Sequence, residues 1–235
     1  MLRHYFVSSI VLTTLFSIAS LFSSCGGGQG NEQSGNEKAV STKPTEKKTD
    51  DQAAKKILFF GTSLTAGYGL DVTEAFPALI QHKIDSLKLP YKVVNAGLSG
   101  ETSAAGKTRI DWLLKQPFDI IVLELGANDG LRGLPLTETK DNLQQITDKV
   151  KKKYPQVRFV LAGMQIPPSM GAEYAQEFKS IFPELARKNN MVLVPFLLQG
   201  VGGVPKLNQK DGIHPTVEGQ KILAENVWAQ LKGLL

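Results

Sequence analysis

The chain has 235 residues, of which 42% are hydrophobic and 21% are charged, and its formal net charge is +5. This composition is typical of a globular protein of one or at most two domains. The basic residues form no dense run with interleaved aromatics, which argues against nucleic-acid binding, although their excess is a mild bias toward anionic surfaces. A single cysteine excludes an internal disulfide and leaves no cysteine pair for a zinc or iron–sulfur site.

Residues 1–25 have the layout of a secretory signal peptide. Arg3 gives a positive start, an apolar stretch diluted by Ser and Thr runs from Tyr5 to Phe22, and small residues precede Cys25. A run of about 20 apolar residues could also span a bilayer. The hydroxyl residues and the cysteine at its end favour the signal peptide.

The sequence FSSC at 22–25 resembles a bacterial lipoprotein processing site, with Phe22 in place of the usual leucine. The resemblance implies that Cys25 is lipidated, becomes the new N-terminus and attaches the protein to a membrane. Gly26 stands where an inner-membrane retention signal would resemble Asp, which favours the outer membrane of a Gram-negative cell, facing the periplasm or the cell surface. Ordinary secretion with cleavage nearby is the alternative.

Residues 26–55 are predicted to be a disordered tether. They lack aromatics, contain few apolar residues and are rich in Gly, Asn, Lys, Thr and Glu. Such a segment cannot bury enough surface to offset the entropy lost on ordering. A flexible chain of this length spans roughly 30 Å, enough to hold a domain away from a membrane surface.

Residues 56–235 alternate short apolar runs with amphipathic helical patterns. In the first helix, at 76–87, the apolar residues recur at helical spacing and leave His82 among the polar side chains that face water. The other predicted helices are Thr102–Lys115, Thr137–Lys153, Glu173–Asn189 and Thr216–Leu231. The predicted strands are Ile57–Phe60, Tyr91–Val94, Asp119–Leu125, Val157–Met164 and Met191–Val194. Alternating strands and helices predict a doubly wound parallel sheet, in which binding sites form at the carboxyl ends of strands.

Polar and glycine residues follow the first three predicted strands and precede the last helix. The segments are GTSLTAG at 61–67, NAGLSGET at 95–102, ELGANDG at 124–130 and DGIHP at 211–215. Each segment alone has an ordinary explanation: a helix N-cap, a tight turn or one surface ion pair. Their joint occurrence at the edge where the fold would bring them together favours a catalytic site.

Elimination identifies the base. His4 lies in the signal segment and His82 on the polar face of a helix, so His214 is the only histidine suited to activate Ser63. Asp211, three residues earlier, can orient its ring. Suitable oxyanion donors are the N–H groups of Ser63 and Gly100 and the side-chain amide of Asn128.

Competing chemistries find little support in the sequence. A metal site for Asp211 and His214 lacks an HExxH motif, a cysteine pair and a second usable histidine. Neither phosphate-binding glycine fingerprint follows the first strand, which argues against a nucleotide or flavin protein. We therefore expect no cofactor.

The four segments resemble the blocks of the SGNH (GDSL-like) hydrolases, in which Ser63, Gly100, Asn128 and His214 occupy the naming positions. Within that family the chain is most similar to the bacterial periplasmic acyl-thioesterase, lysophospholipase and arylesterase group. The similar phrases are GTSLTAGYGL at 61–70, VVNAGLSGETS at 93–103, LELGANDGLRG at 123–133, MQIPPSMGAEY at 164–174 and DGIHP at 211–215. One departure is Thr62, where the first block usually has aspartate.

The resemblance implies a three-layer α/β/α fold of flavodoxin-like type, with a mostly parallel five-stranded sheet. It also implies cofactor-free hydrolysis of small acyl esters or thioesters through an acyl-enzyme. In this reading Ser63 is the nucleophile, His214 the base and Asp211 its orienter, while Ser63, Gly100 and Asn128 stabilise the oxyanion. The segment 130–136 resembles a loop beside the acyl pocket, and Met164, Ile166, Pro167 and Pro168 either line the same groove or pack the loop.

Two alternatives remain at this point. A carbohydrate O-acetylesterase uses the same fold, and a surface lipoprotein could retain the scaffold without catalysis. We expect a monomer, because no coiled-coil pattern demands a dimer.

Overall fold

The computed structural model describes residues 54–235, whose centre is a sheet of five parallel strands. The strands lie in the order β2-β1-β3-β4-β5, so the chain starts in the middle, moves to one edge and then returns past its start. Their bounds are β1 Lys55–Gly61, β2 Tyr91–Gly97, β3 Ile120–Glu124, β4 Arg158–Ala162 and β5 Val192–Val194. The expectation of an α/β fold with a parallel sheet is confirmed.

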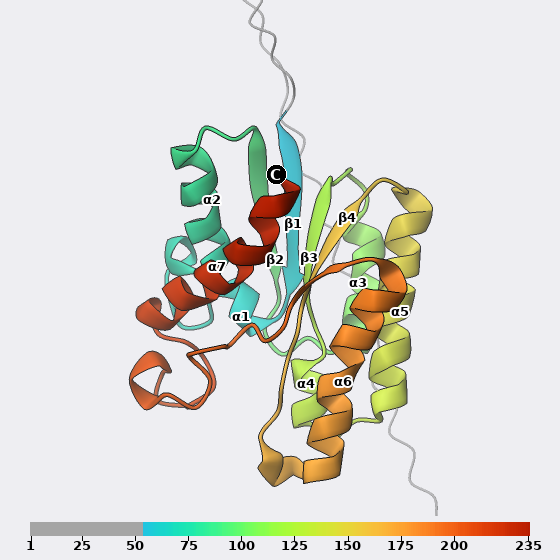
Figure 1. Cartoon of the computed structure of the whole chain (residues 1–235), viewed down its shortest axis with the longest axis vertical. Coiled ribbons are helices and arrows are strands. Elements are labelled where there is room, and N and C mark those ends of the chain that lie inside the picture. The colour runs from blue at the N-terminus through green and yellow to red at the C-terminus, as the bar shows by residue number, and fades with distance from the viewer. Residues whose placement is uncertain (1–53) are drawn as a thin grey trace, which may run out of the picture. The chain divides into compact units, whose positions relative to one another are not determined.

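Helices cover both faces of the sheet (Figure 1). One face carries α2 (Phe76–Ser86) and α7 (Val217–Leu231), and the other carries α3 (Ser103–Leu113), α5 (Leu136–Lys153) and α6 (Ala172–Asn189). Two short helices, α1 (Ser63–Ala66) and α4 (Ala127–Leu131), begin where β1 and β3 end. Four 3-10 turns complete the secondary structure: Val72–Glu74, Pro168–Met170, Pro205–Leu207 and Lys232–Leu234.

The central strands are apolar because both of their faces are covered. Ile57, Leu58, Phe59 and Phe60 of β1 are fully buried, and every residue of β3 is buried as well. A strand between two helical layers has no solvent face, so it lacks the polar alternation of a half-exposed strand. The carboxyl ends of β1 and β3 therefore form a rigid platform.

The expected elements agree with the structure within a few residues, and the largest differences concern short elements. The residues after β1 and β3 were expected to be turns, whereas they form the one-turn helices α1 and α4. Helices of this length have too few residues for a periodic pattern. No helix within residues 54–235 is long and apolar enough to cross a membrane. The predicted signal peptide, Cys25 and most of the predicted tether lie outside the described residues.

Candidate active site

The sheet brings the candidate residues toward one edge, at its topological switch point. Ser63 opens α1 directly after β1, and Asn128 lies in α4 directly after β3, the neighbouring strand. Gly100 follows β2, on the other side of β1, while Asp211 and His214 lie in the loop between β5 and α7. This is the crevice in which doubly wound sheets bind ligands.

Ser63, His214 and Asp211 form a continuous hydrogen-bonded chain. Ser63 Oγ lies 2.9 Å from His214 Nε2, and His214 Nδ1 lies 2.7 Å from Asp211 Oδ2. A carboxylate only accepts, so Nδ1 carries a proton and Nε2 of the neutral ring is free to accept the serine proton. The arrangement matches the geometry of a serine nucleophile with an oriented base.

The Asp211 carboxylate is held in its ionised form by local donors. Its Oδ1 accepts hydrogen bonds from the backbone N–H groups of His214 and Ile213, at 3.0 and 2.9 Å. The backbone bond from His214, followed by the bond from its ring and by the Ile213 N–H, lowers the pKa of Asp211 from 3.8 to about 2. Asp211 therefore remains charged at any pH at which an imidazole base can function.

Tyr68, which follows α1, packs against the imidazole of His214 and connects the loop that carries His214 to the segment after β1. Its ring centroid lies 4.5 Å from that of His214. Gln209, five residues before His214, donates its side-chain amide to the Tyr68 carbonyl at 2.7 Å and to the Pro215 carbonyl at 3.0 Å. These contacts position the loop of the base, residues 195–216, which contains no strand of its own.

Asn128 and Gly100, the two expected oxyanion donors outside the turn of Ser63, differ in their position relative to the cavity. Asn128 lines the cavity beside Ser63 and donates one amide hydrogen to the Glu101 carbonyl at 3.0 Å, which leaves its second hydrogen free. Gly100 lies on the adjoining turn, outside the cavity lining, and its carbonyl accepts from Arg132 at 3.0 Å. Its φ of +78° is the left-handed conformation that glycine adopts without strain.

Asp129, which follows Asn128 in α4, anchors this helix to its neighbours. Its carboxylate is buried and accepts from the backbone and hydroxyl of Ser103, at 2.8 and 2.5 Å. Asn142 of α5 donates to the same hydroxyl at 3.1 Å. This network joins α3, α4 and α5 and therefore orients the neighbouring Asn128.

A buried carboxylate beneath the nucleophile was missed by the sequence analysis. Glu124, the last residue of β3, is fully buried and accepts from the backbone N–H and hydroxyl of Thr62 and of Thr65. Burial raises its pKa, and the four donors oppose that effect. Thr62, the departure noted above, thus supplies a donor beside Ser63. The available signal was an acid ending an otherwise apolar strand.

Ser63, Asn128 and His214 open onto a largely apolar cavity of about 510 Å³. Met164, Ile166, Pro167 and Pro168, expected at or after the end of the fourth strand, all line it. From the segment 130–136 only Leu131 does so. The other lining residues are Thr62, Leu64, Ala127, Gln165, Phe196, Leu198, Gly202, Gly203, Asn208, Gly212 and Ile213. A cavity of this lining suits a hydrocarbon chain.

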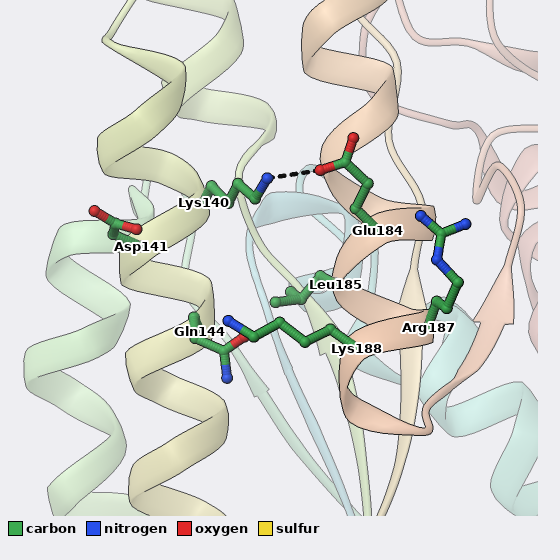
Figure 2. A pocket seen from close by; sticks show the side chains of 7 residues that line it. All are labelled: Lys140, Asp141, Gln144, Glu184, Leu185, Arg187 and Lys188. Carbon is green, nitrogen blue, oxygen red and sulfur yellow. Dashed lines mark hydrogen bonds and ion pairs between the residues drawn. The ribbon is translucent and has the colours of Figure 1, made fainter.

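A second hollow, between α5 and α6, contains no nucleophile (Figure 2). It is lined mainly by charged side chains, among which Lys140 and Glu184 form an ion pair of 2.6 Å. Without a histidine or a hydroxyl it offers no means of attacking an ester. The residues that the structure describes also contain no cluster of side chains able to hold a metal ion.

Comparisons with known proteins give one family model and several similar proteins. The GDSL-like Lipase/Acylhydrolase family matches residues 59–222. Esterase TesA of Pseudomonas aeruginosa is 40% identical over 188 residues, which are 80% of this chain and 92% of the relative. The Escherichia coli protein named thioesterase 1/protease 1/lysophospholipase L1 is 38% identical over 185 residues, covering 78% and 86% of the two chains.

A solved structure extends the similarity to three dimensions. The psychrotrophic esterase EstA from Pseudoalteromonas sp., in a form inhibited by monoethylphosphonate, superposes with a TM-score of 0.72 and 32% identity. The superposition covers 77% of this chain and 98% of that chain.

Proposed function

The chain belongs to the GDSL-like lipase/acylhydrolase family and is a carboxylic-ester hydrolase, and we propose that Ser63 is its nucleophile and His214 its general base. The observation that carries the proposal is the hydrogen-bonded chain from Ser63 through His214 to Asp211, opening on an apolar cavity. No metal or cofactor is needed for this chemistry.

In the first half-reaction Ser63 Oγ attacks the carbonyl carbon while its proton moves to His214 Nε2. Asp211 stabilises the imidazolium that forms, because its negative charge lies 2.7 Å from Nδ1. The free hydrogen of Asn128 and the N–H groups of Ser63 and Gly100 bind the oxyanion. When the intermediate collapses, the C–O or C–S bond breaks and His214 protonates the leaving alcohol or thiol. Water then hydrolyses the acyl-enzyme by the same steps.

The cavity and the names of the relatives support a substrate class. Met164, Ile166, Phe196 and Leu198 give the cavity an apolar wall suited to an acyl chain. Relatives are named arylesterase, and thioesterase and lysophospholipase. We propose that this chain hydrolyses aryl esters, lysophospholipids or acyl thioesters of medium chain length.

The test of the esterase proposal uses p-nitrophenyl esters from acetate to palmitate. Ser63→Ala and His214→Ala should each lower kcat by about 10⁴ or more. Matched controls are Ser99→Ala, which alters an exposed serine near the site, and His82→Ala, which alters an exposed histidine on α2. Equal activity of wild type and both site variants would exclude the serine mechanism. An optimum at acetate would exclude the medium-chain assignment and point to an O-acetylesterase.

We also propose that the protein is exported and anchored to the outer membrane through a lipid on Cys25. The support is the sequence of residues 1–25 and of Gly26. Metabolic labelling with palmitate in a Gram-negative host should mark the wild type and leave Cys25→Ser unlabelled. Labelling of both proteins, or of neither, would exclude the anchor.

A further inference from the structure

Charges are separated between the two ends of the described domain. The first turns of helices carry acids, such as Glu138 of α5, Glu173 of α6 and Glu218 of α7. The last turns of two of these helices carry cations, with Lys151–Lys153 ending α5 and Arg187 and Lys188 ending α6. Because these helices begin at the carboxyl edge of the sheet, the acids lie toward the active site and the cations toward the opposite edge.

That opposite edge, where the strands begin, presents a group of exposed cations that we term the basic edge. None of its members forms an ion pair with a carboxylate in the part of the chain that the structure describes. The basic edge consists of Lys55, Lys88, Lys115, Lys152, Lys153 and Arg158.

Direct contacts hold the segments of the basic edge together. The N–H of Lys55 donates to the Pro90 carbonyl at 2.9 Å, and Arg158 Nη2 approaches the Tyr91 hydroxyl at 3.4 Å. On the other face, Tyr154 donates its hydroxyl to the Leu114 carbonyl at 2.9 Å and so joins the ends of α5 and α3. Lys56 Nζ donates to Gln116 Oε1 at 2.9 Å and so links the start of β1 to the segment after α3 that carries Lys115.

Helix stability explains only part of this surface. Cations in a last turn interact favourably with the helix dipole, which accounts for Lys152 and Lys153. Lys88 and Lys115 directly follow the C-caps of α2 and α3 and can gain from the same effect. Lys55 and Arg158 open strands β1 and β4, where no helix gains from them. Three acids lie at this edge. Asp85 and Asp111 are paired with Lys92 and Lys149, and Asp119 accepts from the backbone N–H of Lys56 at 2.8 Å, so six cations face one carboxylate that has no cationic partner.

Two large apolar side chains stand exposed beside the basic edge. Trp112, in the last turn of α3, is 65% exposed, and its carbonyl accepts from the N–H of Lys115. Leu87, directly before Lys88, is 59% exposed. Tryptophan and leucine among lysines suit the headgroup region of a bilayer, where an apolar body and a cation both find partners.

We propose that the basic edge, with Trp112 and Leu87, docks on the anionic headgroups of a phospholipid bilayer. Two features favour lipid over nucleic acid. The aliphatic side chain of Leu87 cannot stack on a base, and, resting on the anchor proposed above, Cys25 precedes β1 in sequence, and β1 begins at this edge. Docking in this way turns the cavity away from the bilayer. The enzyme then takes its ester from the aqueous side and not from the membrane on which it rests.

The experiment uses residues 26–235, which lack the apolar segment and Cys25. Any binding to lipid is then independent of the proposed lipid anchor. The described core draws on residues from 57 onward and is covered on both faces, which indicates that this part folds by itself. Flotation with vesicles of phosphatidylcholine containing 30% phosphatidylglycerol should recover the protein, whereas pure phosphatidylcholine should not. Raising the salt from 0.05 to 0.5 M should release it.

The decisive variant replaces Lys88, Lys115, Lys152 and Lys153 with Gln. Each cation near an anionic surface changes partition about fivefold, so the variant should bind at least about 100-fold more weakly. All four side chains are exposed, so the fold should be retained.

A matched control replaces the same number of cations elsewhere, at Lys140, Lys179, Lys206 and Lys221. This control has the same net charge and should keep most of the binding. Equal loss in both quadruple variants would show that net charge alone binds lipid, and would overturn the docking surface. Release of the protein by an RNA oligonucleotide at physiological salt would overturn the lipid assignment.

Fluorescence tests the orientation. In a Trp228→Phe background Trp112 is the only tryptophan, and its emission should shift to the blue on anionic vesicles. The bound protein should hydrolyse a water-soluble ester at an unchanged rate, because its cavity faces water. An unshifted Trp112, or activity lost on binding, would contradict docking through this edge.

Discussion

Replacement of Asp211 by Asn tests the orientation of the base by changing charge and leaving shape intact. The amide oxygen can keep the two backbone bonds, from Ile213 and His214, that now reach Oδ1. The amide nitrogen then faces Nδ1, and two donors cannot bond to each other. The His214 ring then favours the tautomer with its proton on Nε2. In that tautomer Nε2 can no longer accept the proton of Ser63.

The size of the effect follows from the 2.7 Å separation of Nδ1 and Oδ2. Two unit charges at that distance attract by about 6 kcal/mol at an effective dielectric constant of 20 and by about 1.5 kcal/mol in bulk water. The Asp211 side chain is 37% exposed and that of His214 18%, so the value lies between these limits. With about 1.4 kcal/mol per tenfold in rate, kcat of Asp211→Asn should fall by about 10²–10⁴.

The assay is the steady-state hydrolysis of p-nitrophenyl butyrate, with thermal unfolding measured in parallel. KM and the midpoint of unfolding should remain close to wild type, because the backbone bonds and the cavity are preserved. Asp211→Ala, which removes the two backbone bonds as well, should lower both kcat and stability. A kcat of Asp211→Asn within tenfold of wild type would refute the assigned role of the carboxylate.

Three further expectations concern the surroundings of the nucleophile. Gly97→Ala would place its Cβ against the backbone of Ala66 and should lower the free energy of unfolding in urea by about 3 kcal/mol. The control Gly233→Ala, which has open space around it, should lower that free energy by less than about 0.5 kcal/mol, and equal losses would contradict the close approach of β2 to α1. Asn128→Ala should lower kcat by about 10²–10³ with KM unchanged, and an equal rise in KM would argue against an oxyanion donor. Burial raises the pKa of Glu124 above 4.5, so its contribution to stability is full below that pH and is lost as pH rises through the raised value. Glu124→Gln should therefore flatten the curve of unfolding free energy against pH, and parallel curves of wild type and variant would contradict this.

Much of the fold could be predicted because its signals are local. The apolar runs of β1 and β3 and the amphipathic patterns of α2 and α5 identify each element without knowledge of its neighbours. The one-turn helices α1 and α4 are set instead by the strand ends that hold them, which is why turns were expected there.

The site, like the fold, has residues that local sequence predicts and residues whose roles depend on contacts between distant segments. Asp211 and His214 are close in sequence, and the place of Ser63 follows from the end of a strand, so their convergence could be expected. The role of Glu124 depends on the register of β1 beside β3, which pairs Gly61 with Glu124. The packing of Tyr68 on His214 joins residues 146 positions apart and carries no local signal.

Ser63 and His214, the proposed nucleophile and base, belong to parts of the molecule with different resistance to local unfolding. Ser63 extends from the buried centre of the sheet, while His214 ends a short, largely exposed turn at 209–214, which is retained by the side-chain bonds of Gln209 and by its N–H to the His214 carbonyl. Segments with few buried contacts open long before a core does. Mild urea should therefore separate Ser63 from His214 while the sheet stays folded, and hydrogen exchange should be fast at 210–213 and slow in β1 and β3. We therefore expect activity to be lost reversibly, through opening of this turn, before the fold itself is lost.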